Sequence, residues 1–221
     1  MYSNLIIKEA CCENYHQALK AEKLGANRIE LCFDLYHGGT TPSYGYVKQC
    51  KKNLKIPIHT IIRPRKGDFI YDINDIEIMK NDIKLFVNEL KVDGIVIGLL
   101  TNKREIDIKN TLDLINYAKS FNNNLNVTFH MAFDEIANED NYKNLIDIIK
   151  NLGCNRILTK GGIGFTNAKE GKNMLKKFIE YSNNKIIILL GGGVTKDNYL
   201  DLSEFTGTKE VHGTKIVGIL D

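Results

Sequence analysis

The sequence of 221 residues lacks several features that mark common classes of protein. No apolar run is long enough to span a membrane, and the only early one, at residues 5–7, is too short for a secretory signal peptide. The sequence has 30 lysine and arginine residues, and the lysines are scattered along predicted helix faces, without the basic stripe that nucleic-acid binding requires. We therefore expect a cytoplasmic protein that binds neither membranes nor nucleic acid.

The cysteines lack a disulfide pattern. Their number is odd and their spacing matches no disulfide framework; they are Cys11, Cys12, Cys32, Cys50 and Cys154. In a chain without a secretion signal, this indicates reduced thiols in a cytosolic setting. The sequence also lacks a linker or a low-complexity segment, so we expect a single domain over residues 1–221.

Short β-branched runs alternate with helical patterns along the whole chain. Strands are predicted at 5–10, 28–32, 57–62, 94–99, 126–130, 156–159, 186–190 and 210–216. Helices are predicted at 15–24, 42–52, 75–90, 108–120, 142–152, 168–181 and 197–204, and a Thr41-Pro42 start is expected for the second. Eight strands with intervening helices predict one (β/α)8 barrel of the TIM type. No G-x-G-x-x-G follows the first strand, which argues against an open doubly wound sheet.

The two halves of the sequence repeat one motif. Residues 24–31 read LGANRIEL and residues 152–159 read LGCNRILT, four strands apart, as expected for duplicated half-barrels. The eighth unit is incomplete, because only residues 217–221 follow the last strand and the last outer helix must be absent or much reduced. We expect this to leave an apolar flank uncovered, and a second subunit to cover it in a homo-oligomer, a dimer or a tetramer.

Nearly every predicted strand ends in a polar residue or a glycine. In such a barrel these carboxyl ends meet at one face, where the site lies. The residues at the ends are Glu9, Cys11, Glu30, Cys32, Arg63, Arg65, His130, Asp134, Thr159, Gly161, Gly162, Gly191, Gly192, Gly193, His212 and Gly213. Such a concentration predicts a polar site at this face.

Strand alternation brings two cysteines together. Cys11 shares a strand face with Glu9, and Cys32 shares one with Glu30. If both faces point inward, two thiols and two carboxylates converge, and two thiolates suit Cu(I). A nearby arginine such as Arg28 would lower the thiol pKa values. The alternative is that both cysteines pack as small hydrophobes, as we expect of the other three.

Two arginines flank a proline after the third strand. Arg63 and Arg65, with Asp68 close behind, form either a salt-bridge cluster at the barrel mouth or a clamp for an anion. The glycine triplet Gly191–Gly193 precedes a helix and resembles barrel phosphate sites, although a tight turn needs the same residues.

Two histidines also end strands. His130 is a candidate base or ligand, with the Asp134 carboxylate four residues later to orient it, and His212 ends the last strand. His16, His37 and His59 are expected to be surface or packing residues.

Several of these blocks together resemble the CutC copper-homeostasis family over essentially the whole chain. The blocks are Glu9-Ala-Cys11, residues 25–32 (GANRIELC), 38–43 (GGTTPS), 62–69 (IRPRKGDF) with Tyr71, 128–134 (TFHMAFD), 156–159 (RILT), 191–193 (GGG) and 210–212 (EVH). The resemblance implies a cytoplasmic α/β barrel that forms homo-oligomers and is associated with copper tolerance. It also implies Cu(I) binding at Cys11 and Cys32.

The chain departs from the family pattern at two points. Met131 stands where an arginine usually follows the histidine, which removes one cation from the mouth. Family members also generally continue beyond the eighth strand, so the oligomer contacts are expected to differ. A rival reading remains: an enzyme acting on a small phosphorylated or carboxylated substrate held by Arg63, Arg65 and Gly191–Gly193, with Glu30 or His130 as base.

Overall fold

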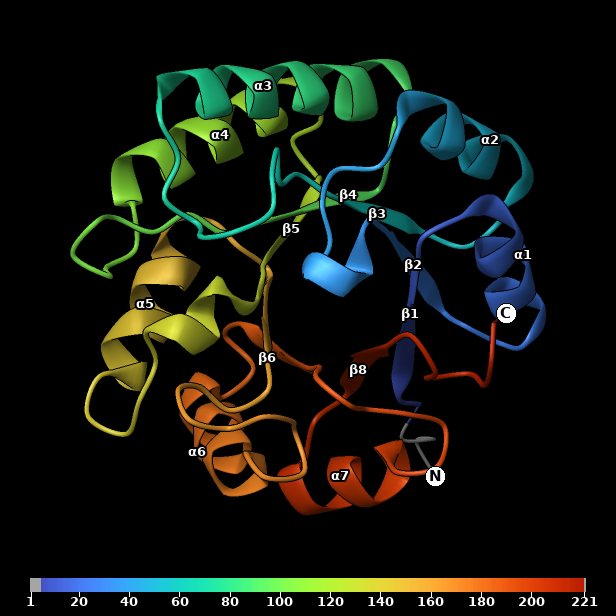
Figure 1. Ribbon diagram of the computed structural model, residues 1–221. Coiled ribbons are helices and arrows are strands. Elements are labelled where there is room, and N and C mark those ends of the chain that lie inside the picture. Colours follow the sequence, from blue (N-terminus) through green and yellow to red (C-terminus); the bar gives the residue numbers. More distant parts are fainter. Residues whose placement is uncertain (1–4, 221) are drawn as a thin grey trace.

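Eight parallel strands close into a barrel in the computed structural model, which describes residues 5–220 (Figure 1). The strands are β1 (Ile7–Cys12), β2 (Arg28–Leu31), β3 (Ile58–Ile61), β4 (Gly94–Ile97), β5 (Asn126–Phe129), β6 (Arg156–Thr159), β7 (Ile187–Leu190) and β8 (Glu210–Gly213). Each strand pairs with the next, and β1 pairs with β8, which closes the ring. The predicted TIM-type barrel is confirmed.

Helices surround the barrel (Figure 1). They are α1 (Tyr15–Lys23), α2 (Tyr44–Asn53), α3 (Ile73–Ile83), α4 (Ile108–Phe121), α5 (Tyr142–Asn151), α6 (Lys172–Ser182) and α7 (Tyr199–Thr206), with a π-helical turn η2 (Lys84–Glu89) directly after α3. Two short 3-10 helices, η1 (Leu35–His37) and η3 (Met131–Glu135), follow β2 and β5. Within residues 5–220, no helix has the length and apolarity to cross a membrane.

Some predicted boundaries were wrong for local reasons. The first strand runs two residues further than predicted, to Cys12, because pairing with β2 continues through the Cys12–Leu31 pair. The second helix begins at Tyr44, since the Ser43 hydroxyl accepts from the Tyr46 amide and caps it. The hydroxyl of Thr41 instead accepts from the amide of Arg63, which ties the two loops together.

Residues 214–220, which follow β8, form no outer helix, as predicted. This segment runs from β8 toward α1 (Figure 1), where Ile216, Val217 and Leu220 are buried in the main core. The prediction of an uncovered flank was therefore wrong in part, because these side chains fill space that a helix would occupy. Leu24 and Ile219 remain exposed beside them.

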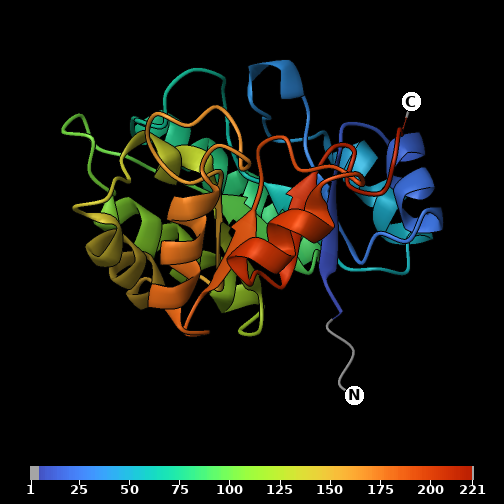
Figure 2. The same cartoon turned by 90° about the horizontal axis from the view of Figure 1, so that it is seen from below.

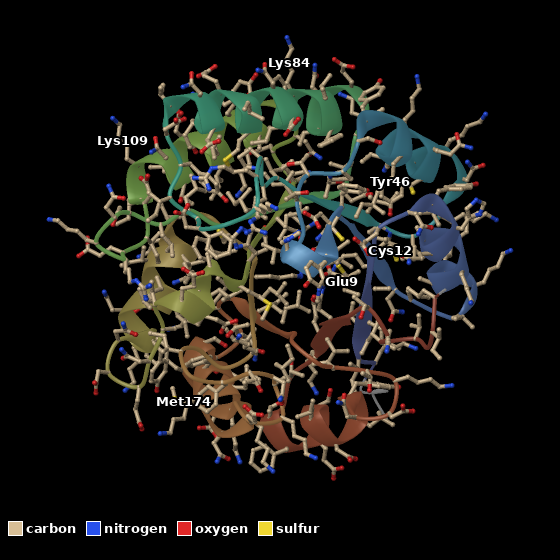
Figure 3. All side chains as sticks on the ribbon, viewed as in Figure 1. Glu9, Cys12, Tyr46, Lys84, Lys109 and Met174 are labelled. Atoms are coloured by element: carbon tan, nitrogen blue, oxygen red, sulfur yellow. The ribbon has the colours of Figure 1, made fainter. Side chains whose placement is uncertain are left out.

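The barrel interior contains charged side chains. Glu9 lies near the centre of the ring of strands in Figure 3, whereas Lys84 and Lys109 lie at the periphery. The repeated motif explains part of this arrangement, because Arg28 and Arg156 occupy equivalent positions. Both donate to one oxygen of Glu210, at 2.6 and 2.7 Å. Arg28 also pairs with Glu9, so two arginines and two glutamates compensate one another inside the barrel.

The η1 turn lies over the carboxyl ends of the strands. Figure 1 shows it above the centre of the ring, and Figure 2 shows it projecting at the end opposite the start of β1. The amide of Leu35 in this turn donates to Glu13 at 2.7 Å, and Arg63 donates to the carbonyls of His37 and Gly39. The turn is therefore fixed over the barrel mouth.

Candidate metal and ligand site at the barrel mouth

Two thiols meet at the mouth. The sulfur atoms of Cys11 and Cys32 are 3.4 Å apart, and both residues are buried. Cys12, Cys50 and Cys154 are also buried, but they belong to the main core between strands and helices. Strand alternation, which predicted that Cys12 points away from Cys11, agrees with their separate clusters.

A carboxylate and an imidazole adjoin the thiols. One ligand atom each from Cys11, Glu30 and His212 lies within 4.8 Å of the others, a spacing that one metal ion could bridge. The Nδ1 atom of His212 is 2.8 Å from Glu9 Oε1. A carboxylate bonded to one ring nitrogen orients the other toward a metal, as is usual for metal-binding histidines.

The charges around the thiols depend on one another. Burial would raise the pKa of Glu9, but Arg28, His212 and His59 hold it well below its usual range. Burial would lower the pKa of His212, yet Glu30, Cys11 and Glu9 raise it well above its usual value. Burial, with Glu9, raises the pKa of Glu30 to about 7. These shifts favour the ionised form of Glu9 and the protonated form of His212.

The thiol pKa values are raised, contrary to the sequence expectation. A hydrogen bond with Cys32 and burial raise the pKa of Cys11 well above its usual value. The same bond favours the thiolate of Cys32, but burial and Glu30 outweigh it, so its pKa is also raised. Arg28 cannot offset this, because its guanidinium pairs with Glu9 and Glu210.

The two arginines that flank Pro64 have different surroundings. Buried Arg63 donates to the carbonyls of His37, Gly39 and Gly67 and packs over the Phe69 ring. Arg65 is part of a salt-bridge cluster away from the mouth cavity.

That cluster is carboxylate-rich. Arg65 donates to Asp75 at 2.9 Å and to Asp68 at 3.1 Å, and its guanidinium lies over the ring of Tyr71. The salt-bridge alternative from the sequence thus describes Arg65 and Asp68. Of the two arginines, only Arg63 remains a candidate for binding an anion.

His130 is buried and oriented by backbone. Its Nδ1 accepts from the amide of Ala132 at 3.1 Å, and burial, followed by the charge of Arg63, lowers its pKa to about 3. Asp134 does not orient it: this carboxylate accepts from the Thr159 hydroxyl and the amides of Lys160 and Gly162, and so fixes the loop after β6. The expected His130–Asp134 pair was wrong, because the η3 turn directs Asp134 toward β6.

The glycine triplet makes a tight turn after β7. Gly192 and Gly193 have φ values of +80° and +75°, which favour glycine. The amide of Gly191 donates to the Thr159 carbonyl, and the Gly192 carbonyl accepts from Ala168. These contacts explain the glycine triplet as a tight turn. Anion binding by the triplet stays a prediction.

Sequence reasoning missed a buried histidine inside the barrel. His59 is buried, with Nδ1 3.6 Å from Glu9. Gly94 on the adjacent strand provides its space, because a Cβ there would lie 2.5 Å from the His59 ring. Gly98 does the same for His130, at 2.3 Å. The alternation that places His59 on the same strand face as Arg63 was the signal for it.

A cavity of about 180 Å³ lies beneath the η1 turn. Its lining includes Cys11, Glu30 and His212 together with Arg63 and His130. The mouth is thus an α/β-barrel site with thiol, carboxylate, imidazole and guanidinium groups around one space.

These features define a TIM-type barrel protein with a candidate metal site, and comparison with known proteins gives its family. The model of the CutC family matches residues 6–217, so the chain belongs to the CutC family. A family protein CutC of Enterococcus faecalis is 42% identical over 216 residues, which cover 96% of this chain and all of that protein. The human copper homeostasis protein cutC homolog is 37% identical over 210 residues, covering 95% of this chain and 73% of the human protein.

Solved structures agree with this assignment. The crystal structure of the copper homeostasis protein CutC of Streptococcus agalactiae has a TM-score of 0.89 and 38% identity, covering 96% of this chain and all of that one. The deoxyribose phosphate aldolase of Aeropyrum pernix has a TM-score of 0.68 at 11% identity, covering 99% of this chain and 88% of that one. At such low identity, this likeness concerns the barrel fold alone.

Proposed function

We propose that this protein binds Cu(I) through Cys11 and Cys32 and takes part in copper homeostasis in the cytoplasm. The observation that carries the proposal is the 3.4 Å separation of the two sulfur atoms. This is less than twice a metal–sulfur bond of about 2.3 Å, so both sulfurs can reach one ion. Soft thiolates favour Cu(I) over harder divalent ions. The names of the human and streptococcal relatives support the same reading.

His212 is the proposed third ligand. It lies with Cys11 and Glu30 in the group of closely spaced ligand atoms, and its other nitrogen is held by Glu9. Because the thiol pKa values are raised and His212 is protonated, binding must displace protons. Apparent Cu(I) affinity should therefore rise with pH.

An anaerobic titration with Cu(I) against a competing Cu(I) chelator tests the proposal. The parent should bind one equivalent tightly, and Cys11→Ser/Cys32→Ser should lose that binding. A matched control is Cys12→Ala/Cys154→Ala, which removes two buried thiols from the main core and should retain it. Equal affinity in the parent and the Cys11/Cys32 variant would eliminate the thiol site.

A further inference from the structure

Three residues around the mouth cavity each keep one buried polar atom without a hydrogen-bond partner. The atoms are Arg63 Nε, His130 Nε2 and Glu30 Oε2, and all three residues line the cavity. A buried polar group without a partner costs free energy, so native proteins rarely leave one unpaired. Three around one cavity indicate positions that a bound molecule would satisfy.

Two of these atoms are hydrogen-bond donors. Arg63 Nε always carries a hydrogen, because a guanidinium stays protonated in proteins. His130 uses Nδ1 to accept from the Ala132 amide, so the hydrogen of the neutral ring is on Nε2. The cavity lining therefore offers two donors, Arg63 Nε and His130 Nε2, and one acceptor, Glu30 Oε2.

The charge of Arg63 is not compensated by a carboxylate. Inside the barrel, Arg28 and Arg156 pair with Glu9 and Glu210. Arg63 contacts three backbone carbonyls, the Phe69 ring and the Tyr71 hydroxyl, and it forms no ion pair with any residue in 5–220. A buried cation is stable only when an anion or polar groups surround it. A single negative charge in the cavity would balance it.

The cavity limits the size of the bound molecule. Its volume of about 180 Å³ corresponds to about six water molecules at roughly 30 Å³ each. Its walls include Leu35, Ile61, Phe69 and Leu158, so a short carbon chain would contact apolar surface. Met131 also lines it and brings no charge. Of the two cationic side chains in the lining, His212 is paired with Glu9, which leaves Arg63 beside His130 without a carboxylate partner. A phosphate dianion would face the Glu30 carboxylate, and Arg63 is the cavity cation that no carboxylate pairs with.

We propose that this cavity binds a small hydroxycarboxylate monoanion, with its carboxylate at Arg63 Nε and His130 Nε2 and its hydroxyl directed toward Glu30 Oε2. This site is separate from the copper proposal, because Arg63 and His130 are not among the proposed metal ligands. Cys11 and Glu30 line the cavity and also belong to the group of closely spaced ligand atoms. A bound hydroxycarboxylate would therefore lie next to the metal position.

Calorimetric titration of the full chain with glycolate, lactate, glycerate and 3-hydroxybutyrate tests the proposal. At least one should bind saturably at millimolar concentration, whereas lactamide and inorganic phosphate should not. His130→Phe keeps the ring packing against Phe69 but removes the donor, and should weaken binding by about tenfold or more, as expected when a charged group loses a hydrogen bond. Arg63→Gln should abolish binding if it folds.

Arg65→Gln is the matched control, because Arg65 belongs to the same motif but pairs with Asp75 and Asp68. It should bind the hydroxycarboxylate as the parent does. Cys32→Ser, which removes the thiol pair without changing a cavity-lining residue, should also bind it, so failure of the copper proposal and failure of this one are distinguishable. Absence of saturable binding of all four anions, equal binding of lactamide, or unchanged affinity in His130→Phe would overturn the inference.

Discussion

The sulfur atoms of Cys11 and Cys32 lie 3.4 Å apart on neighbouring strands, although the residues are 21 positions apart in the chain. The contact follows from barrel register, in which Cys11 aligns with Glu30 and Cys32 follows two residues later on the same strand face. Two reduced thiols held this closely form a preorganised pair. The pair can either share an ion or be joined by oxidation.

Oxidation of the metal-free protein should link Cys11 to Cys32. A disulfide needs the sulfurs to approach from 3.4 Å to about 2.05 Å, a small movement. The reaction should be slow at neutral pH, because both thiol pKa values are raised and the thiolate is the attacking species. After diamide treatment, a thiol assay in denaturant should count two fewer thiols in the parent and in Cys154→Ala. A full count in the parent would contradict the prediction, and Cys32→Ser should show no such loss.

His59 should make stability depend on pH. Burial lowers its pKa to about 4, with Arg28 and Arg156 adding to the effect and Glu9 opposing it. The unfolded chain therefore takes up a proton as pH falls through about 6.5, while the folded protein does so only near 4. The stability that His59 contributes is present above pH 6.5 and is lost progressively below it. Between pH 7 and pH 5, this loss is about 2 kcal/mol.

Urea unfolding at both pH values measures this loss. His59→Asn should lose less stability than the parent between pH 7 and pH 5, whatever its absolute stability. His16→Asn replaces an exposed histidine and should follow the parent. The same pH dependence in His59→Asn and the parent would refute the assignment.

Alanine at Gly94 or Gly98 should destabilise the barrel. A Cβ at Gly94 would lie 2.5 Å from the ring of His59, and one at Gly98 would lie 2.3 Å from the ring of His130. Overpacking of this kind costs about 1–3 kcal/mol, measurable by denaturant unfolding. Gly45→Ala, in α2 with no atom within 4 Å of the added carbon, should cause no loss.

A double-variant cycle separates crowding from backbone effects. Gly98→Ala should cost less in a His130→Ala background than in the parent, because the ring that it meets has gone. Equal costs in the two backgrounds would show that the ring contact is not the cause.

We predict a homo-oligomer, as the sequence suggested. Leu24 and Ile219 are 45% and 68% exposed beside the segment that replaces the eighth helix. Sedimentation velocity at micromolar concentration should give a dimer or tetramer, and Leu24→Asp/Ile219→Asp should shift it toward the monomer. A monomeric parent would rule out this association. Leu200→Asp is a control, since Leu200 is an exposed leucine in α7.

The periodic parts of the sequence predicted the barrel well. The alternation of eight β-branched runs with amphipathic helices fixes the order of elements, and side-chain alternation placed Cys11 and Cys32 on one face. Helix starts were less accurate, because side-chain capping decides them: Ser43 rather than Thr41 caps α2.

Contacts between distant strands could not be predicted in the same way. The sequence shows that Arg63 and Arg65 are close along the chain, but not that one points to backbone carbonyls and the other to Asp75. Likewise, strand alternation can place His59 on the same face as Arg63, but it does not show that His59 faces Glu9, which is 50 residues earlier in the sequence. Such pairings depend on barrel closure, which brings together residues that local patterns do not relate.

Gly94 in β4 and Gly98, which directly follows this strand, have an evolutionary consequence. The ring of one histidine occupies the space where each glycine would otherwise carry a Cβ. Positions 59 and 94 therefore cannot vary independently, and neither can positions 130 and 98. A relative that carries a larger residue at position 94 should have a smaller one than histidine at position 59. Covariation of these two position pairs across homologues would thus record the packing of the barrel interior.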